Sequence, residues 1–542
     1  MKRVLLSSLV ALSFVGCGGG GGDDLYGDGD NSIVSKYPES EKNITITNSN
    51  QIEVIQKTSS STINLDVPNG NDIYIVVTSR FDNQRIYIEG QNSALSNEND
   101  LDYKLLSSNS NFITPKNVLK FREKLQDKLK ETENNSTLLT RTISLEPRVT
   151  NENDSEEFYI DVFDSFGNEQ TKKITATARK VIYNVETKYG IKNLVVWVED
   201  DEYNNRVSQD MVDELADTFL KDGENNDLYD WVTNIYGEEW GTTNKSNLIA
   251  ENDYIDILID DMGVDGIAGY FYAKDNFTTS TEPYSNEKIM FYINSRVYTR
   301  DNYTEEENEK EVLTTLAHEF HHMIHFYQRY VLKDDPHPTW LNEMLSETTE
   351  DLVATKIGYK GPRNVDPTDG SAGPSGNDGG RYPVFNDNNT LSVTQWNNSL
   401  EDYSKVNAFG AFLVRNYDGA KLLHDIEYSS YAGYKAVEEA TKEDFKNLVS
   451  KWGTAVVLSD NDNPSISIPR YNFGDFKNVE YNDVTYNLGS INFFNYIPTP
   501  EFKSYAILNE DANLYYHLGR VYGKTTVNVS IPNGADIAII SK

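Results

Sequence analysis

The sequence predicts a multidomain α+β protein, and three observations support that fold class. The chain has 542 residues, enough for about three or four domains. Near both ends, short runs alternate apolar and polar residues, with turn residues between them, as β-strands do. The middle of the chain instead combines buried-strand runs with long stretches of helical spacing. We therefore expect a mixed central domain flanked by β-sandwich-like modules.

The first segment, residues 1–17, has the pattern of a signal peptide. Two basic residues precede an apolar run that ends at Val15, and the single cysteine of the chain, Cys17, follows after one glycine. A single cysteine excludes an intrachain disulfide. The pattern resembles a bacterial lipoprotein signal, which implies a lipid on Cys17. We expect an extracytoplasmic protein that is lipid-anchored to the bacterial membrane. The outer membrane or cell surface is favoured over the inner membrane. The alternative is an ordinary secretory signal with an incidental cysteine.

Two segments follow before the central domain. Residues 18–43 are rich in Gly and Asp and predict a flexible tether. Residues 44–180 contain short runs of period two and predict an N-terminal β-rich domain, interrupted by a helix near residues 115–133. This domain is expected to be a spacer or stability module, and the alternative is a pro-region that covers the active site.

Residues 461–542 predict a C-terminal β-rich module that resembles part of the N-terminal one. Residues 62–75 (TINLDVPNGNDIYI) align with residues 526–539 (TVNVSIPNGADIAI), and eight of the fourteen positions match. The shared Pro-Asn-Gly turn favours a β-hairpin in each copy. The sequence thus predicts two similar β modules that bracket the central domain.

The central domain, residues 181–460, is expected to begin with a small sheet and to end with a helical half. Apolar runs predict the strands, and apolar residues at helical spacing predict the helices. The expected strands are residues 194–198, 255–259 and 288–293, and the expected helices are residues 208–221, 311–330, 407–417, 433–440 and 444–458.

The motif with the clearest chemistry is His318-Glu319-Phe320-His321-His322. Two histidines four residues apart on a helix project from the same face, so His318 and His322 can bind one metal ion. Glu319 lies beside that metal and can accept a proton from a metal-activated water. This is the HExxH pattern of zinc hydrolases. His321 and His325 are more simply interpreted as packed or solvent-facing residues, although His325 shares the ligand face and could be a spare ligand.

A second acidic motif follows on the helix expected to reach residue 354. Glu343 supplies a third ligand, and Glu347, one turn later, is placed to hydrogen-bond a ligand histidine. The fourth position stays open for water, as in a catalytic zinc site.

These motifs resemble those of the gluzincin metallopeptidases, and their amino-acid sequences are similar to those of the hyicolysin family (peptidase family M30). The resemblance covers roughly residues 181–458 and rests on residues 317–326, 339–347 and 266–271. It implies a thermolysin-like catalytic domain, one catalytic zinc, a strand that pairs with a peptide substrate, and endopeptidase action on proteins or peptides. It also implies a tyrosine that stabilises the oxyanion, for which Tyr403 is the candidate and His424 the runner-up. A metzincin is excluded, because position 325 is His and not Gly.

The amino-acid composition limits the partners and the functions that this protein can have. With 49 basic and 85 acidic residues, the formal charge is −36, which disfavours nucleic acid as a partner. Acidic loops at residues 222–230 and 366–378 are candidates for calcium, with plain loops as the simpler interpretation. Two alternatives stay open: a surface adhesin or binding lipoprotein with a vestigial peptidase core, and a structural zinc protein in which His325 closes the metal.

Overall fold

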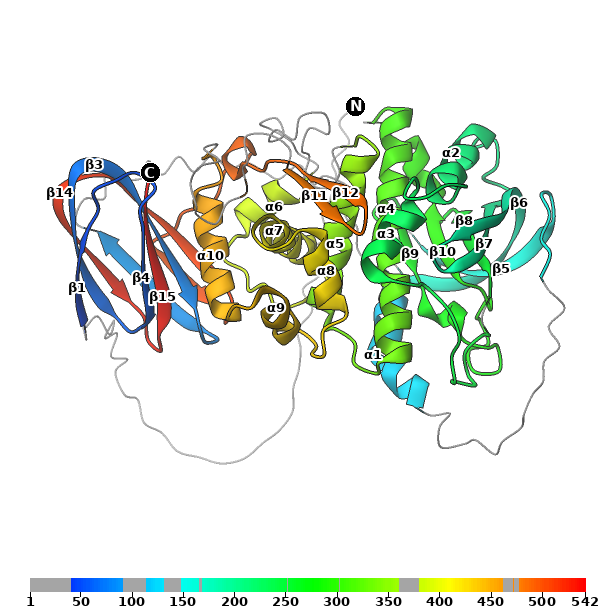
Figure 1. Cartoon of the computed structure of the whole chain (residues 1–542), viewed down its shortest axis with the longest axis horizontal. Coiled ribbons are helices and arrows are strands. Elements are labelled where there is room, and N and C mark those ends of the chain that lie inside the picture. Colours follow the sequence, from blue (N-terminus) through cyan, green and yellow to red (C-terminus); the bar gives the residue numbers. More distant parts are fainter. Residues whose placement is uncertain are drawn as a thin grey trace, which may run out of the picture. The chain divides into compact units, whose positions relative to one another are not determined.

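The computed structural model is a mixed α+β protein, which confirms the predicted class at that level (Figure 1). None of the helices it describes is both long and apolar enough to cross a bilayer. The signal segment with Cys17 and the acidic loop at residues 366–378 lie outside the described residues. The description covers residues 40–90, 114–130, 148–164, 168–250, 252–301, 303–359, 380–461, 471 and 477–542.

One seven-stranded sheet combines strands from the two ends of the chain. Its order is β13-β4-β14-β3-β15-β2, and β1 pairs with β3. The long strands β3 and β14 pair antiparallel from Ser61–Val529 to Thr78–Asn513. Apolar side chains of this sheet enclose a separate core. The strands are β1 (Ser40–Thr45), β2 (Ile52–Thr58), β3 (Ser61–Ser79), β4 (Gln84–Gly90), β13 (Tyr505–Leu508), β14 (Asn513–Ser530) and β15 (Ala535–Ser541).

This sheet differs from the two separate β modules expected from the sequence. The repeated segments are not two hairpins, because they pair with each other. The first Pro-Asn-Gly lies inside β3, where Gly70 has φ +72° and the pairing with β14 shifts register opposite it. The second connects β14 to β15, which lie on either side of β3. Strand β1 also begins at Ser40, inside the expected tether.

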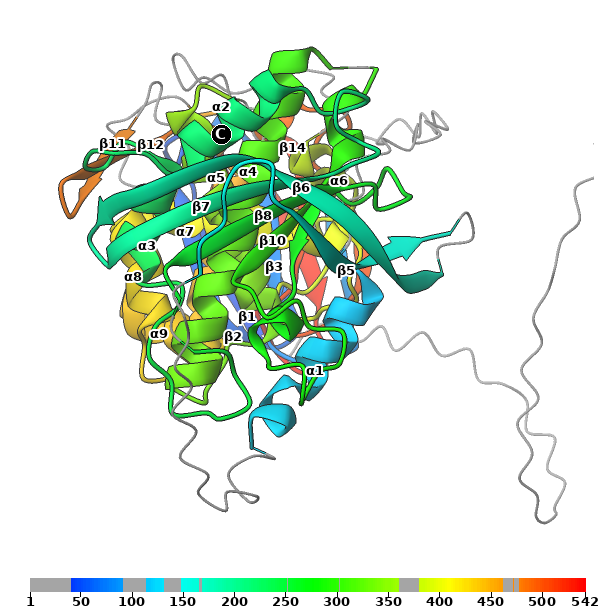
Figure 2. The same cartoon turned by 90° about the vertical axis from the view of Figure 1, so that its right-hand side faces the viewer.

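A six-stranded sheet organises the central domain, in the order β5-β6-β7-β8-β10-β9. The strands expected at residues 194–198, 255–259 and 288–293 fall on β7, β8 and β10, which run parallel to one another. Figure 2 shows β6, β7 and β8 side by side. Strands β5 and β6 belong to this sheet and not to the N-terminal β unit, so the expected boundary at residue 180 falls inside β6. The strands are β5 (Ser155–Phe163), β6 (Glu169–Thr187), β7 (Gly190–Glu199), β8 (Tyr254–Asp260), β9 (Gly269–Phe271) and β10 (Met290–Asn294).

Each helix expected from the sequence has a counterpart in the structure. Those expected at residues 311–330 and 407–417 begin earlier, at residues 305 and 400, and the others agree within about three residues. A two-stranded sheet of β11 (Lys477–Tyr481) and β12 (Val484–Leu488) accompanies them. The helices are α1 (Lys116–Lys130), α2 (Gln209–Phe219), α3 (Leu228–Tyr236), α4 (Glu305–His325), α5 (Thr339–Lys356), α6 (Arg381–Asp387), α7 (Leu400–Asn416), α8 (Ala420–Glu427), α9 (Tyr434–Thr441) and α10 (Phe445–Val457), with short 3₁₀ turns at η1 (Ala273–Asn276), η2 (Ser295–Thr299) and η4 (Phe493–Asn495).

The motif helix α4 is well defined by its own sequence. Thr304 and Glu307 form a capping box at its start, and three acidic residues in the first turn complement the helix dipole. Phe320 packs among aromatic rings of α2, α3 and β10, so one face of α4 is fixed in the core. The helix continues as a π-helical segment, η3 (Phe326–Leu332), a form that often occurs at functional sites.

Close packing also fixes α5 against α7. A Cβ atom added to Gly410 of α7 would lie 2.2 Å from Oγ1 of Thr348 and 3.1 Å from Cγ of Met344. Only glycine permits this approach of the two helices. The contact holds α5, which carries both acidic residues of the second motif, in one position relative to the helical half.

Candidate metal centre and active site

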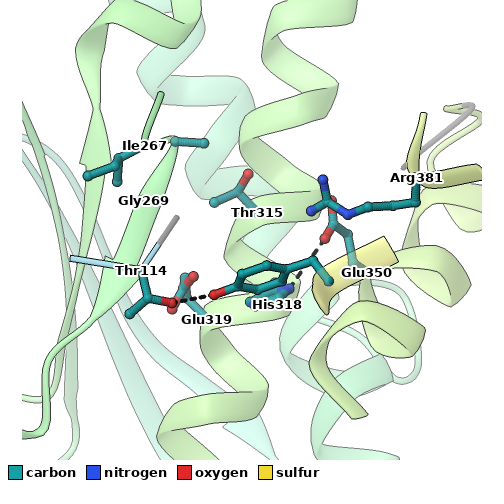
Figure 3. Close-up of a pocket in the computed structure, with 10 residues that line it drawn as sticks. Thr114, Ile267, Gly269, Thr315, His318, Glu319, Glu350 and Arg381 are labelled. Atoms are coloured by element: carbon teal, nitrogen blue, oxygen red, sulfur yellow. Dashed lines mark hydrogen bonds and ion pairs between the residues drawn. The ribbon is translucent and has the colours of Figure 1, made fainter. Parts of the chain in front are cut away.

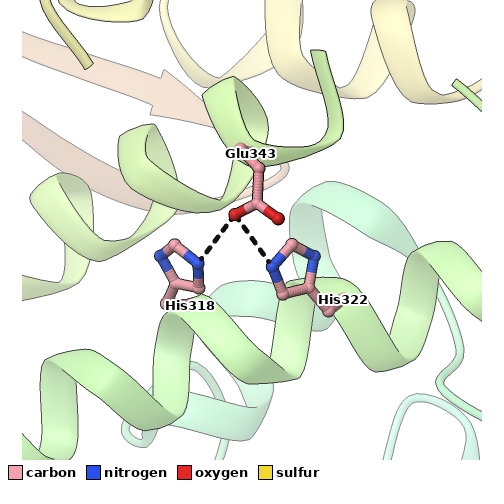
Figure 4. Close-up of side chains that lie close together, drawn as sticks. All are labelled: His318, His322 and Glu343. Carbon is pink, nitrogen blue, oxygen red and sulfur yellow. Dashed lines mark ion pairs between the residues drawn. The ribbon is translucent and has the colours of Figure 1, made fainter. Parts of the chain in front are cut away.

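Three side chains from α4 and α5 converge on one point (Figure 4). Oε2 of Glu343 lies 3.3 Å from Nε2 of His318 and 3.3 Å from Nε2 of His322. All three residues are buried, and Oε2 has no hydrogen-bond partner among the described residues. Their atoms form one of the groups that could hold a metal ion.

This geometry fits a tetrahedral zinc ion. Ligand atoms about 2.0–2.1 Å from zinc at tetrahedral angles lie about 3.3–3.4 Å from one another. The two distances from Oε2 of Glu343 to the histidine nitrogens have that value, and two imidazoles with one carboxylate are a donor set that zinc prefers. A carboxylate oxygen buried without a hydrogen bond is otherwise costly. The predicted ligand trio of His318, His322 and Glu343 is therefore brought together by the fold.

The Nδ1 atoms of His318 and His322, which point away from Glu343, each have a partner that fixes the orientation of the ring. Nδ1 of His322 lies 3.1 Å from Oδ1 of Asn342 and 3.1 Å from Oγ of Ser346. Nδ1 of His318 lies 3.3 Å from Oε2 of Glu350. Such contacts orient a ligand histidine and raise its basicity.

Glu347 takes a different place from the one expected. Its Oε1 lies 4.0 Å from Nδ1 of His318, beyond hydrogen-bond distance. Its carboxylate instead accepts two hydrogen bonds from Arg381 at 2.8 and 2.9 Å, and one from Asn407 at 3.1 Å. Glu347 thereby joins α5 to α6 and α7, and Glu350 is the carboxylate that reaches His318. Glu350 lies seven residues after Glu343, so helical periodicity was a signal for it.

Glu319 lies in a pocket beside His318, which belongs to the predicted ligand trio (called the metal trio below) (Figure 3). Its Oε2 accepts a hydrogen bond of 2.7 Å from the backbone N–H of Phe271 in β9. Burial raises the pKa of Glu319 to about 7, while the charges of His318 and Arg122 act in the opposite direction. A carboxylate with this pKa can exchange a proton near neutral pH. The pocket is lined by Thr114, Ile267, Ala268, Gly269, Thr315, His318, Glu319, Glu350, Arg381 and Tyr403.

The two candidates for the oxyanion donor lie in different places. Tyr403 lines the same pocket as Glu319, and its hydroxyl shares a hydrogen bond of 2.6 Å with Oγ1 of Thr114. Burial, and then the charge of Glu343, raises the pKa of Tyr403 well above its usual value, so the hydroxyl keeps its proton. His424 lies outside this pocket, where its Nδ1 contacts the carbonyl of Ile235 at 2.7 Å. The geometry favours Tyr403.

Helix α1 contributes a residue that the sequence did not single out. Nη1 of Arg122 donates a hydrogen bond of 2.8 Å to Oε1 of Glu343, the oxygen that does not face the histidines. Burial alone would raise the pKa of Glu343, but His322, His318 and Arg122 together hold it well below its usual value. Arg122 and Glu343 are 221 positions apart, so no local pattern links them. The expected helix near residues 115–133 thus contacts the candidate metal centre and is not confined to a spacer module.

The acidic loop at residues 222–230 does not resemble a calcium site. Asp227 is the N-cap of α3, and its carboxylate accepts hydrogen bonds from the backbone N–H groups of Asp230 and Lys221. Asp230 in turn accepts one from Asn225. No group of potential metal ligands involves these residues in the described part of the chain.

Comparisons with known proteins agree with this geometry. The family model described as Peptidase M30 matches residues 173–446, which include α4, α5 and the whole metal trio. A neutral metalloprotease, ShpI from Staphylococcus hyicus, is 27% identical over 195 residues, which is 35% of this chain. The chain spans 39% of the length of that relative. The family model covers half of the chain, and the chain therefore belongs to the peptidase M30 family.

Proposed function

We propose that this protein is a zinc-dependent metalloendopeptidase that hydrolyses peptide bonds of extracytoplasmic proteins or peptides. The observation that carries the proposal is the position of Glu343 Oε2, 3.3 Å from both histidine nitrogens, with Glu319 in the adjoining pocket. Membership of the peptidase M30 family supports it. His318, His322 and Glu343 would hold the ion, and Asn342, Ser346 and Glu350 would orient the two histidines. Arg122 would balance the charge of Glu343.

The roles of the remaining residues follow from their chemistry. Zinc bound by the trio would supply Lewis acidity toward water and the scissile carbonyl. Glu319 would accept a proton from the attacking water and deliver it to the departing amine, for which a pKa near 7 is well matched. The hydroxyl of Tyr403 would donate a hydrogen bond to the oxyanion. This arrangement of residues supports a gluzincin-like catalytic unit.

Strand β9 is the proposed binding edge for the substrate backbone. Among the described strands, it is the last of its sheet and pairs with β10 alone, so its other edge has no strand partner and could pair with an extended peptide. Residues 267–269 at and before its start line the pocket that contains Glu319. A peptide added there would pass alongside the metal trio.

The test is cleavage of an unfolded protein by the purified full chain, compared with Glu319→Gln and with a chelator-treated sample. We expect cleavage by the unchanged protein, and loss of cleavage in both comparisons. Glu319→Gln should retain its zinc, because Glu319 is not a ligand. Zinc binding without cleavage by the unchanged chain would point to a pro-form with a masked active site or to the binding-protein alternative. The absence of both zinc and cleavage would overturn the peptidase proposal.

We also propose that Cys17 carries a lipid that anchors the protein to the outside of a bacterial membrane. The proposal rests on the apolar run ending at Val15 and on the position of the single cysteine. Labelling of expressing cells with a fatty-acid probe should mark the wild-type chain and not Cys17→Ser. Equal release of both chains into the medium would contradict the anchor.

A further inference from the structure

A second cluster of potential metal ligands lies on a neighbouring face of the motif helix. His321 and His325 are one turn apart on α4, as His318 and His322 are. Each lies three residues after its counterpart in the first pair. They face Glu427, the last residue of α8, and His337, which lies just before α5. His321, His325 and Glu427 form a group that could hold a metal ion. None of these four residues lines the pocket of the proposed catalytic site.

The four side chains meet at the carboxylate of Glu427. Its two oxygens lie 3.0 and 3.1 Å from Nδ1 of His325. Oε2 lies 3.9 Å from Nε2 of His321 and 4.0 Å from Nε2 of His337. The exposed fractions are 0% for His321, 1% for His325, 1% for Glu427 and 3% for His337. Three imidazoles thus surround one carboxylate in a site closed to solvent.

Glu427 lacks the lysine or arginine partner that two other buried carboxylates have. Buried Asp256 is paired with Arg148, and buried Glu347 with Arg381. Among the described residues, no lysine or arginine forms an ion pair with Glu427. The neighbouring Arg329 instead directs its guanidinium to backbone carbonyls, including that of Glu427. A carboxylate at this depth is costly without a cationic partner, and the imidazoles that face it supply a positive charge only when they are protonated or bind a metal ion.

One imidazole nitrogen is unpartnered and directed toward the carboxylate. Nδ1 of His321 lies 2.7 Å from Oγ of Ser346, which fixes the ring. Its Nε2 then faces Glu427 and has no hydrogen-bond partner among the described residues. The same serine oxygen lies 3.1 Å from Nδ1 of His322, a ligand of the first site. Ser346 therefore contacts a histidine of each cluster.

We propose that His321, His325 and Glu427 bind a second divalent metal ion with the ligand preferences of zinc, and that His337 completes the site. Imidazoles with one carboxylate suit this class of metal, and a closed set of four protein ligands is typical of a structural site. The distances of 3.1, 3.9 and 4.0 Å around Oε2 of Glu427 approach the tetrahedral value of about 3.3–3.4 Å. His321, His325 and Glu427 would bind the ion after shifts of about half an ångström. His337 is not part of this close group, so it would move farther and would exchange its hydrogen bond to the carbonyl of Ile426 for the metal.

The ion would hold together three segments around the catalytic residues. It joins the C-terminal part of α4 to the end of α8 and to the loop that precedes α5. Because α5 carries Glu343, the second ion fixes the relative position of the helices that supply the first site. The second ion is structural and has no access to substrate.

The experiment measures zinc per chain by mass spectrometry, after reconstitution of the full chain and dialysis against a weak chelator. We expect two zinc ions in the unchanged protein, one in His318→Gln, one in Glu427→Gln and none in the double variant. Glu439→Gln is the matched control and should leave two ions, because the partly exposed carboxylate of Glu439 accepts hydrogen bonds from Ser429 and Ser430 and does not face the second cluster. Two ions in Glu427→Gln would overturn the proposal.

A second measurement avoids any dependence on the folding of Glu427→Gln. His318→Gln retains every residue of the second cluster, so cobalt added to this metal-free variant should give the intense visible bands of a tetrahedral site. Cobalt should also raise its Tm. A folded His318→Gln chain, checked by circular dichroism, that neither binds cobalt nor gains stability would overturn the proposal and leave a protonated imidazole as the partner of Glu427. Neither readout uses peptidase activity, so failure of the proposed function would be seen separately.

Discussion

Arg122 of α1 donates a hydrogen bond of 2.8 Å to Oε1 of Glu343, and the opposite oxygen of that carboxylate faces the two histidines. In the metal-free protein, the negative charge of Glu343 is thus balanced by the guanidinium of Arg122, which belongs to a helix far away in the sequence. A zinc ion in the trio would supply further positive charge on the other side of Glu343.

The first prediction concerns Arg122→Gln. In metal-free protein, the substitution leaves the buried charge of Glu343 with one less partner, so the free energy of unfolding should fall by about 1–3 kcal/mol. Zinc replaces the missing charge, and the increase in Tm on adding zinc should therefore be larger in Arg122→Gln than in the unchanged protein. Thermal unfolding with and without zinc measures both effects.

Lys124→Gln is the control for this substitution, because Lys124 lies on the exposed face of the same helix. It should unfold like the unchanged chain in both conditions. A smaller zinc effect in Arg122→Gln would contradict the argument and would mean that Arg122 mainly holds Glu343 in position for the metal.

The second prediction compares two carboxylates one turn apart on α5. Glu350→Gln removes the charge next to Nδ1 of His318, and zinc affinity should fall roughly 10- to 100-fold, as for other outer partners of ligand histidines. Glu347→Gln breaks the buried pair with Arg381 and should mainly lower stability, by about 3–5 kcal/mol. Competition with a chromogenic chelator and urea unfolding separate these effects. The reverse ranking, with Glu347→Gln losing more zinc affinity, would refute the assignment of Glu350.

The third prediction concerns the hydroxyl of Tyr403. Tyr403→Phe removes the proposed oxyanion donor and should lower kcat by about 10²- to 10³-fold with little change in KM or in zinc content. Thr114→Val removes the hydrogen-bond partner of Tyr403 and keeps the donor, so its kcat should stay within a few-fold of normal. Full kcat in Tyr403→Phe would show that the oxyanion is stabilised elsewhere.

The grouping of His318, His322 and Glu343 could be predicted from sequence because the pattern that places these residues is local. His318 and His322 lie on one helix at a spacing that fixes their common face, and Glu343 occurs within the next helix. Three strands of the central sheet were also predictable, since β7 and β10 each contain a continuous apolar run and β8 is mostly apolar around Asp256. In these cases the pattern within about 30 residues determines the structure.

The features missed by the sequence analysis depend on long-range pairing. The partners Arg122 and Glu343 are brought together only by the tertiary fold, and so are His325 and Glu427. The terminal β segments were each recognised as strands, but periodicity does not reveal that β3 pairs with β14 across more than 430 positions. The internal repeat even suggested the opposite, because two similar segments look like two modules when they are in fact neighbours in one sheet.

The fourth prediction concerns pH and the buried carboxylate of Asp256 in β8. It accepts two hydrogen bonds of 2.6 Å from Arg148 and one of 2.7 Å from Nε1 of Trp197. Burial alone would raise its pKa, but the charges of Arg148 and Lys288, with these hydrogen bonds, lower it below 3.8. A lowered pKa in the folded state means that the carboxylate stabilises the protein above the pKa of the unfolded chain, and that this contribution disappears as the pH falls through the folded pKa.

Asp256→Asn should therefore cost about 3–5 kcal/mol at pH 7, because it leaves Arg148 without its buried partner. The difference between the variant and the unchanged protein should stay constant down to about pH 4 and then shrink, since the unchanged protein alone loses the contribution of Asp256. Urea unfolding at several pH values between 3 and 7 measures this difference. Asp265→Asn is the control, because its pair with Arg296 is exposed and should contribute at most about 1 kcal/mol. A difference that grows as the pH falls below 4 would mean that Asp256 takes up its proton more readily in the folded protein, contrary to the charge balance around β8.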